Sequence, residues 1–233
     1  MSPLAQLESL RELTINHCQV SDISPLSGLD ELVRLALVAN DISELSPLSG
    51  YAKLERLYVD LNDIADLSPL SGMTALTQLG IDSNPVSDLS PLSGLELKEL
   101  SAMSCRISDI SALTGMISLE QLYLSDNSIS DISPLSNLTA LEFLDILDTN
   151  VSDISPLANL TALEILNISD TNVSDISPLA NLTALEYLDV SVTNVTDISP
   201  LANLTNLKEL YLYNTPVTDL SPLDGIEGLT IYQ

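Results

Sequence analysis

The chain has 233 residues, of which 45% are hydrophobic and only 3% aromatic, so its core must be built from aliphatic side chains. Acidic residues outnumber basic residues by 33 to 7, which gives a formal net charge of −26 at pH 7. This charge argues against nucleic-acid partners and anionic membranes. No apolar run reaches the roughly 20 residues that span a bilayer, so we expect no membrane insertion.

The first nine residues precede the regular part of the sequence. Ser2, Pro3, Leu4 and Leu7 match the second half of the repeat described below, so the chain opens in mid-repeat. This segment shows neither the basic stretch nor the apolar run of a signal peptide. We therefore expect a cytoplasmic protein for the sequence as given, and a secreted or cell-surface protein if it is a piece of a longer chain.

From residue 10 onward one pattern recurs about every 22 residues. Its first leucine is found at Leu10, Leu32, Leu54, Leu76, Leu97, Leu119, Leu141, Leu163, Leu185, Leu207 and Leu229. The frame gives ten full repeats over residues 10–228, the fourth of them 21 residues long, and a partial strand over residues 229–233. Such self-similarity predicts stacked units that share one continuous core, so we expect a single domain over residues 1–233.

Residues 163–184, LEILNISDTNVSDISPLANLTA, represent the unit. Leu163, Leu166 and Ile168 begin it, and the alternation of the last two predicts a short strand. Later apolar residues are spaced by three, which favours a 3₁₀ turn, with Ser177 as N-cap and Pro178 as first helical residue. Stacked units predict a curved α/β leucine-rich-repeat solenoid with a parallel sheet on its concave face and 3₁₀ or short helical turns on its convex face.

The eighth position after the first leucine holds a small side chain in every repeat: Cys18, Asn40, Asn62, Asn84, Cys105, Asn127, Thr149, Thr171, Thr193 and Thr215. We expect this ladder column to bond to backbone groups that the turn leaves without partners. Cys18 and Cys105 lie four repeats apart, roughly 19 Å, too far for a disulfide. The pattern predicts buried free thiols that act as small hydrophobes, with reactive or metal-binding cysteines as the alternative.

An acidic column also recurs once per repeat: Asp22, Glu44, Asp66, Asp88, Asp109, Asp131, Asp153, Asp175, Asp197 and Asp219. The favoured interpretation is local, since a carboxylate placed there can accept backbone N–H bonds where the convex turn begins. The rival is a calcium ladder, but one carboxylate per repeat is few for a cation that takes six to eight oxygens. We expect no metal and no other cofactor.

The outward strand positions carry most of the variation between nearly identical repeats. Phe143, Ile165 and Tyr187 occupy one such position in three successive repeats, and six of the eight aromatics point to the concave face. Aromatic side chains that line a groove are typical interface anchors. The candidate partner-binding residues are Arg34, Arg56, Tyr58, Asp60, Asp82, Tyr123, Asp126, Phe143, Asp145, Ile165, Asp170, Tyr187, Asp189, Tyr211 and Tyr213.

The charge along this face is uneven. Between Ile107 and Leu207 there are 14 acidic residues and no basic one, whereas Arg34 and Arg56 lie nearer the N-terminus. The sequence therefore predicts a face that is mixed at one end, and aromatic and acidic at the other. The first and last strands would present bare edges, which predicts end-to-end self-association.

The unit is similar to the 22-residue repeat of bacterial internalins. Residues 129–135, ISDISPL, and residues 151–157, VSDISPL, carry the resemblance most clearly, and it extends over nearly all of residues 2–229. The resemblance implies the solenoid fold. It also implies recognition of a protein on the concave face, as in extracellular adhesins whose targets differ from member to member.

These observations favour a protein-binding module over an enzyme. His17 is the single histidine, and no zinc-binding, nucleophile or phosphate-loop motif accompanies it. A second hypothesis is an acidic inhibitor of a basic partner, such as an immunity protein or nucleic-acid mimic. A third is an engineered or structural array without a natural partner, in which the charge serves solubility.

Overall fold

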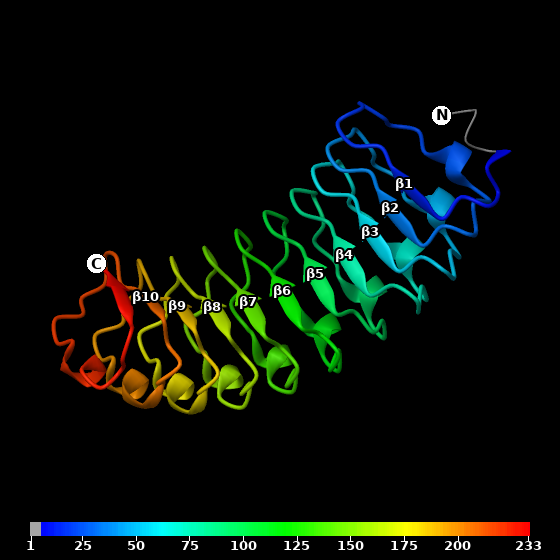
Figure 1. Cartoon of the computed structure of the whole chain (residues 1–233). Helices are drawn as coiled ribbons and strands as arrows, with labels where there is room; N and C mark the ends of the chain where they lie inside the picture. The colour runs from blue at the N-terminus through cyan, green and yellow to red at the C-terminus, as the bar shows by residue number, and fades with distance from the viewer. Residues whose placement is uncertain (1–5) are drawn as a thin grey trace. The chain divides into compact units, whose positions relative to one another are not determined.

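The computed structural model describes residues 6–233, and these form two compact units. The first ends at Met116, and the second extends from Ile117 to Gln233. Both units are built from the same repeat. Within each, short parallel strands lie side by side along one face, and 3₁₀ turns lie along the opposite face (Figure 1).

In the described part of the first unit the strands are β1 Glu12–Thr14, β2 Arg34–Ala36, β3 Arg56–Tyr58, β4 Gln78–Gly80 and β5 Glu99–Ser101. The 3₁₀ helices are η2 Ser24–Leu26, η3 Ser46–Leu48, η4 Ser68–Leu70, η5 Ser90–Leu92 and η6 Ser111–Leu113. Each strand pairs with the next in parallel.

The second unit repeats this plan. Its strands are β6 Gln121–Tyr123, β7 Phe143–Asp145, β8 Ile165–Asn167, β9 Tyr187–Asp189, β10 Glu209–Tyr211 and β11 Thr230–Tyr232. Its 3₁₀ helices are η7 Ser133–Leu135, η8 Ser155–Leu157, η9 Ser177–Asn181, η10 Ser199–Asn203 and η11 Ser221–Leu223. The strands again pair with their sequence neighbours in parallel. The predicted leucine-rich-repeat solenoid of about ten repeats is confirmed.

The core consists of aliphatic columns that continue from repeat to repeat. Leu163, Leu166 and Ile168 are each 0% exposed, as are Val173 and Leu179. Each column is closed by the same column in the repeats before and after, so burial depends on stacking. Fully burying one such side chain stabilises the fold by roughly 1.5–3 kcal/mol.

The convex turn begins one residue earlier than the sequence suggests. Ser177 is the first residue of η9 and Pro178 the second, while the N-cap position is Ile176, whose side chain makes no capping bond. The expectation that Ser177 is the N-cap is therefore wrong. The capping acceptor is instead the carboxylate of Asp175, whose Oδ1 accepts the Ser177 N–H at 2.8 Å.

The same bond recurs along the acidic column and confirms its local interpretation. It is made, at 2.8 to 2.9 Å, by Asp22, Asp66, Asp88, Asp109, Asp131, Asp153, Asp175, Asp197 and Asp219. Bonds from the serine N–H and hydroxyl lower the pKa of the carboxyl groups of Asp66, Asp109, Asp153, Asp197 and Asp219. Glu44, the one glutamate of the column, makes no such bond in the described structure.

The ladder column bonds to backbone groups as expected, but in two ways. The Asn84 amide donates to the carbonyls of Val59 and Ile81, and its oxygen accepts the Ile64 N–H, so Asn84 links two repeats. The threonines bond within their own repeat: the Thr171 hydroxyl donates to the carbonyl of Ile168 at 2.6 Å. Asparagine has both a donor and an acceptor at its tip, whereas the shorter threonine hydroxyl reaches one carbonyl.

Both cysteines are free thiols, but the expectation that they are buried is wrong. Cys18 is exposed and Cys105 is half-buried. A column residue is covered when full repeats stack on both sides, and Cys18 lies in the first full repeat of the described chain. The Cys105 thiol faces the carbonyls of Ile81 and Met103, and partial burial raises its pKa.

The last strand differs from the frame by one residue. Glu209 pairs with Thr230 and Tyr211 with Tyr232, so Gly228 rather than Leu229 takes the place of the first leucine. The tenth repeat is therefore 21 residues long, like the fourth. This correction moves Tyr232 from an inward to an outward position.

Candidate functional site

The predicted binding residues lie where the strands and the turns that follow them form one surface in each unit. We call this surface the sheet face. At the first position of a strand are Arg34, Arg56, Phe143, Ile165 and Tyr187, and at the third are Tyr58, Tyr123, Asp145, Asp189 and Tyr211. Beyond the strand ends lie Asp60, Asp82, Asp126, Asp170 and Tyr213. The five predicted residues from Arg34 to Asp82 belong to the first unit, and the ten from Tyr123 to Tyr213 belong to the second.

Aromatic side chains form two groups on the sheet face of the second unit. Tyr123 and Phe143 pack with ring centroids 4.4 Å apart. Tyr211 packs against Tyr187 at 5.1 Å, stacks on Tyr232 at 4.3 Å and lies 6.3 Å from Tyr213. The aromatic sidechains thus support one another on the surface, where they are half-buried or exposed.

A hollow of about 310 Å³ separates the two groups. It is lined by Phe143, Asp145, Ile165, Asn167 and Tyr187, which lie on the adjacent strands β7, β8 and β9. The hollow exists because Ile165 is smaller than the aromatic residues on either side of it. The side chains of Phe143, Ile165 and Tyr187 make its apolar part. Asp145 and Asn167, at the third positions of β7 and β8, make its polar part.

The half-buried carboxylates of the second unit bond to backbone groups. Asp145 Oδ1 accepts the N–H of Leu147 at 3.0 Å, and Asp189 Oδ1 accepts that of Ser191 at 2.8 Å. Asn167, in the same row, accepts the Ser169 N–H in the same way. Burial raises the pKa of Asp145, and the charges of Asp126 and Asp189 act in the same direction.

In the first unit, two carboxylates just beyond the strands accept hydrogen bonds from backbone N–H groups of the next repeat. Asp60 Oδ1 accepts the Asp82 N–H, and Asp82 Oδ1 accepts the Met103 N–H at 2.7 Å. A Cβ on Gly80 would lie 2.8 Å from Asp60 Oδ1, so glycine there leaves room for this carboxylate. Burial raises the pKa of Asp60. These aspartates stabilise the scaffold in addition to giving the face its charge.

The turn that follows each strand holds a residue in the left-handed region. Asp126, Asp148, Asp170 and Val192 occupy this position in successive repeats, with φ of 57°, 50°, 51° and 56°. The backbone N–H of Asp148 and of Asp170 donates to the next repeat, which holds the turn in place. The three aspartates are exposed, and slight desolvation together with Asp170 and Asp126 raises the pKa of Asp148.

The sheet face of the first unit is mixed in charge. Arg34 and Arg56 are neighbours in the β2–β3 register, and both are exposed. The Arg34 guanidinium lies 6.0 Å from the centre of the Tyr58 ring, a cation–π distance. Glu12 and Glu55 line a shallow hollow together with both arginines.

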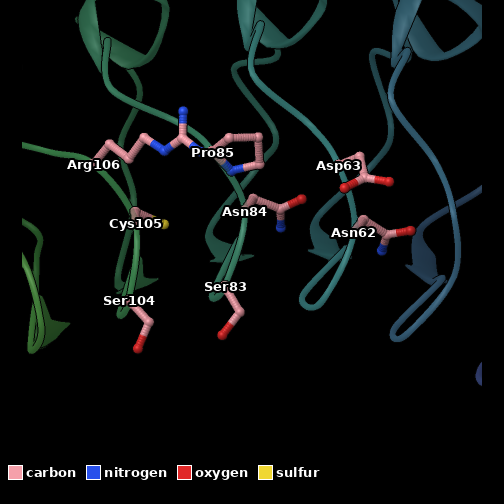
Figure 2. Close-up of a pocket in the computed structure, with 8 residues that line it drawn as sticks. All are labelled: Asn62, Asp63, Ser83, Asn84, Pro85, Ser104, Cys105 and Arg106. Carbon is pink, nitrogen blue, oxygen red and sulfur yellow. The ribbon is translucent and has the colours of Figure 1, made fainter.

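A second hollow of the first unit, of about 330 Å³, lies beside the ladder column, and Figure 2 shows Arg106 extending toward Pro85 at its edge. In most other repeats this position donates a backbone bond, as Asp63 N–H does to the carbonyl of Ile42. Pro85 has no N–H to donate. The polar walls of the hollow include Asn62 and Asn84, whose amides already bond to backbone groups in the ladder column. We therefore attribute this hollow to the scaffold.

Within residues 6–233, no group of three or more His, Cys, Asp or Glu side chains is arranged to hold a metal ion. No helix in this described part of the chain is long and apolar enough to cross a membrane.

The sequence frame missed one aromatic member of the sheet face. Tyr232 stacks on Tyr211 with an interplanar angle of 11°, yet the frame counted from Leu229 turns it inward. The spacing of Gly225, Ile226 and Glu227 matches that of Gly94, Leu95 and Glu96 in the shortened fourth repeat. This match could have revealed the second one-residue deletion.

Comparisons with known proteins agree with this geometry. The family model "Leucine Rich repeats (2 copies)" matches residues 96–137, 117–159, 139–181 and 183–225, more than half of the chain. An internalin (inlF) from Listeria monocytogenes is similar over 98% of this chain and 82% of its own, with 30% sequence identity and a TM-score of 0.88. The chain belongs to the internalin-like leucine-rich-repeat family.

Two further solved structures place this internalin-like chain among its neighbours. Internalin C2 (inlC2) of the same species is 32% identical, with a TM-score of 0.62 over 89% of this chain and 80% of that one. The ectodomain of the receptor kinase GASSHO1/SCHENGEN3 from Arabidopsis thaliana is 21% identical, with a TM-score of 0.83 over 99% of this chain and 30% of that one, which shows the fold alone. A search of curated proteins found no match.

Proposed function

We propose that this chain is a non-catalytic module that binds a protein partner on its sheet face, chiefly in the second unit. The observation that carries the proposal is the placement of aromatic side chains. Tyr123, Phe143, Tyr187, Tyr211 and Tyr232 form packed groups on the surface, while the core of the second unit is aliphatic. Exposed aromatic surface held in a fixed geometry loses little side-chain entropy on binding, which suits an interface anchor.

The neighbours support the same class of function. Leucine-rich repeats are in general a protein-interaction fold, and the GASSHO1/SCHENGEN3 ectodomain is described in complex with CASPARIAN STRIP INTEGRITY FACTOR 2. A plant peptide hormone receptor of the same fold is described in complex with RGF2. We infer that the present chain recognises a folded protein or an extended segment of one.

The test begins with capture of a partner from bacterial and host lysates. The captured protein is then purified, and its Kd is measured for the unaltered chain and for the double variant Tyr187→Ala, Tyr211→Ala. Truncating two central anchors is expected to weaken binding by about 100-fold or more, without unfolding. Asn181→Ala, on the exposed 3₁₀ side of the same unit, is the control and should leave the Kd unchanged. Full-strength binding by the double variant would contradict the proposal.

A second candidate function is inhibition of a basic protein. The observation that favours it is charge, because the 14 acidic residues between Ile107 and Leu207 stand without a basic one. Attraction between exposed charges is screened by salt. A Kd that rises steeply between low and physiological salt supports this candidate, and a Kd insensitive to salt argues against it.

A further inference from the structure

The hollow between the two aromatic groups has the width of one side chain. Phe143, Ile165 and Tyr187 are register partners on β7, β8 and β9. Adjacent strands lie about 4.8 Å apart, so the two aromatic residues stand roughly 10 Å apart across Ile165. After the half-thickness of a ring on each side, this leaves space for one aliphatic chain or one planar group.

The walls of the hollow are supported from behind. Tyr123 packs on Phe143 at 4.4 Å, and Tyr211 packs on Tyr187 at 5.1 Å. Tyr211 also donates a hydrogen bond of 2.8 Å to Glu209, which fixes its ring. Each wall is therefore buttressed by a second ring, so the hollow is preformed rather than produced by a ligand.

The lining of the hollow contains a carboxylate without a cation. Asp145 Oδ1 accepts one backbone N–H, and a carboxylate can accept further bonds at its two oxygens. Burial raises the pKa of Asp145, and the neighbouring charges of Asp126 and Asp189 act in the same direction. The nearest basic residue along the chain in this unit, Lys208, bonds to Glu186 at 2.6 Å.

These features select the charge of the occupant. A neutral apolar group would fill the space but would desolvate Asp145 further without pairing it, which is unfavourable. A cationic side chain would place its aliphatic stem between the rings, its charge over their faces, and its N–H groups toward the carboxylate. Arginine offers a planar guanidinium for stacking, and lysine a compact ammonium.

We propose that the hollow lined by Phe143, Ile165, Tyr187 and Asp145 is a specificity pocket for one arginine or lysine side chain of the protein partner. This inference rests on the proposed function and gives its partner a chemical signature. The pocket supplies selection by charge, and the remaining aromatic surface supplies contact area.

The experiment uses the full chain and small probes. The protein carries ¹³C only in isoleucine δ1 methyl groups, and the resonance of Ile165 is assigned with Ile165→Val. N-acetyl-arginine methylamide, N-acetyl-lysine methylamide and the neutral N-acetyl-norleucine methylamide are titrated separately. We expect either cationic amide, or both, to shift the Ile165 methyl with millimolar affinity, and norleucine to bind at least about fivefold more weakly.

Two variants test whether the Asp145 carboxylate is responsible for the preference for cationic probes. Asp145→Asn removes the charge and keeps the backbone bond, because Asn167 makes that bond in the next repeat. It should weaken binding of the cationic probe about fivefold, because the ion pair with the carboxylate is lost. Glu227→Gln removes one exposed charge elsewhere in the second unit, and should change the affinity far less.

Three outcomes would overturn the inference. They are equal shifts with norleucine, no shift with either cationic amide, and unchanged affinity in Asp145→Asn. None of these requires the partner, so they leave the proposed function standing as long as Tyr187→Ala, Tyr211→Ala weakens partner binding. Loss of the proposed function would instead be seen as partner binding unaffected by that double variant.

Discussion

At the residue scale, two turns recur in the repeat, and the residues in them affect stability in opposite ways. Each aspartate of the acidic column accepts the serine N–H at the start of its own 3₁₀ helix, as Asp153 does at 2.8 Å. At the other turn, the chain tolerates a left-handed residue without using glycine, as Val192 does at φ 56°. The capping bond stabilises the fold, whereas the left-handed backbone at Val192 strains it.

The capping bond predicts unequal effects within one column. We expect Asp153→Ala to lower the thermal midpoint by a few degrees, because the Ser155 N–H loses its acceptor. Glu44→Ala, in the same column but without such a bond, should lower it much less. Differential scanning calorimetry of both variants checks this, and equal losses would show that charge rather than capping matters.

The strained turn predicts a stabilising substitution. Val192 is β-branched, 45% exposed and left-handed, a conformation that costs an ordinary residue about 1–2 kcal/mol. Asn214 occupies the same position in the next repeat, and asparagine tolerates this region. We expect Val192→Asn to increase the free energy of unfolding by about 0.5–1 kcal/mol, and the matched change Asp170→Asn to alter it little. Urea denaturation gives the answer, and a less stable Val192→Asn would refute the strain.

At the element scale, the ladder column joins repeats more strongly where it is asparagine. Asn84 bonds to the backbone of its own repeat and of the preceding one, and it is 2% exposed. Thr171 bonds within its own repeat. Both asparagine and threonine donate to a buried carbonyl of their own repeat. Only the longer asparagine side chain also bonds to the preceding repeat, so it contributes more to the stacking of repeats.

Substitutions at Asn84 separate these roles. Asn84→Ala should cost about 3 kcal/mol, since several backbone groups lose their partner at once, whereas Thr171→Ala should cost about 1 kcal/mol. Asn84→Thr should lie between them, because threonine is native to this column and would keep one bond within the repeat. Urea denaturation of the three variants tests the order, and similar losses at both positions would contradict it.

The sequence predicts these elements well because the repeat supplies many copies of the same evidence. Strand, 3₁₀ turn, ladder and acidic column each recur, so one unusual residue does not hide the pattern. The sequence-based predictions are wrong or incomplete near the ends of the repeat array, and where a side chain can bond to the backbone of its own repeat. Cys18 is exposed because stacking around it is incomplete, and Tyr232 was missed through a one-residue deletion. That Asp145 accepts its own repeat's Leu147 N–H depends on a rotamer, which no pattern of residue types specifies.

Apart from Tyr232, the sequence predicts which aromatic residues lie on the sheet face, but it does not predict how their side chains pack. Alternation in the strands places Phe143, Ile165 and Tyr187 in one row, and the register confirms that row. The hollow over Ile165 follows from side-chain size and ring packing, which require coordinates. The role of these residues in binding stays a prediction, as does end-to-end self-association through the strand edges.

At the scale of the whole molecule, stability should depend on pH in two opposite ways. Burial raises the pKa of Asp60 and Asp145, so their charged forms oppose folding above their folded-state pKa, and protonation relieves that cost as pH falls. Capping lowers the pKa of Asp66, Asp109, Asp153, Asp197 and Asp219, so their contribution is present above the unfolded value and is lost as pH falls through the lowered pKa.

The net charge of −26 adds self-repulsion at neutral pH. We therefore expect the thermal midpoint to rise from pH 7 to a maximum at about pH 5, near the upper edge of carboxyl titration, and to fall below about pH 4. Asp145→Asn should raise the midpoint at pH 7 and lose this advantage in acid. Calorimetry from pH 3 to pH 8 tests the profile, which a midpoint that falls steadily from pH 7 downward would disprove.

Site-specific photo-cross-linking to the purified partner can locate the surface that the partner contacts. p-Benzoylphenylalanine replaces Phe143, a close steric match on the sheet face, or Asn181, which is exposed on the 3₁₀ side of the same unit. If the partner binds the sheet face, we expect a covalent adduct from position 143 and none from position 181. An adduct from position 181 alone would show that the partner binds the 3₁₀ side, and the sheet face would not be the binding surface.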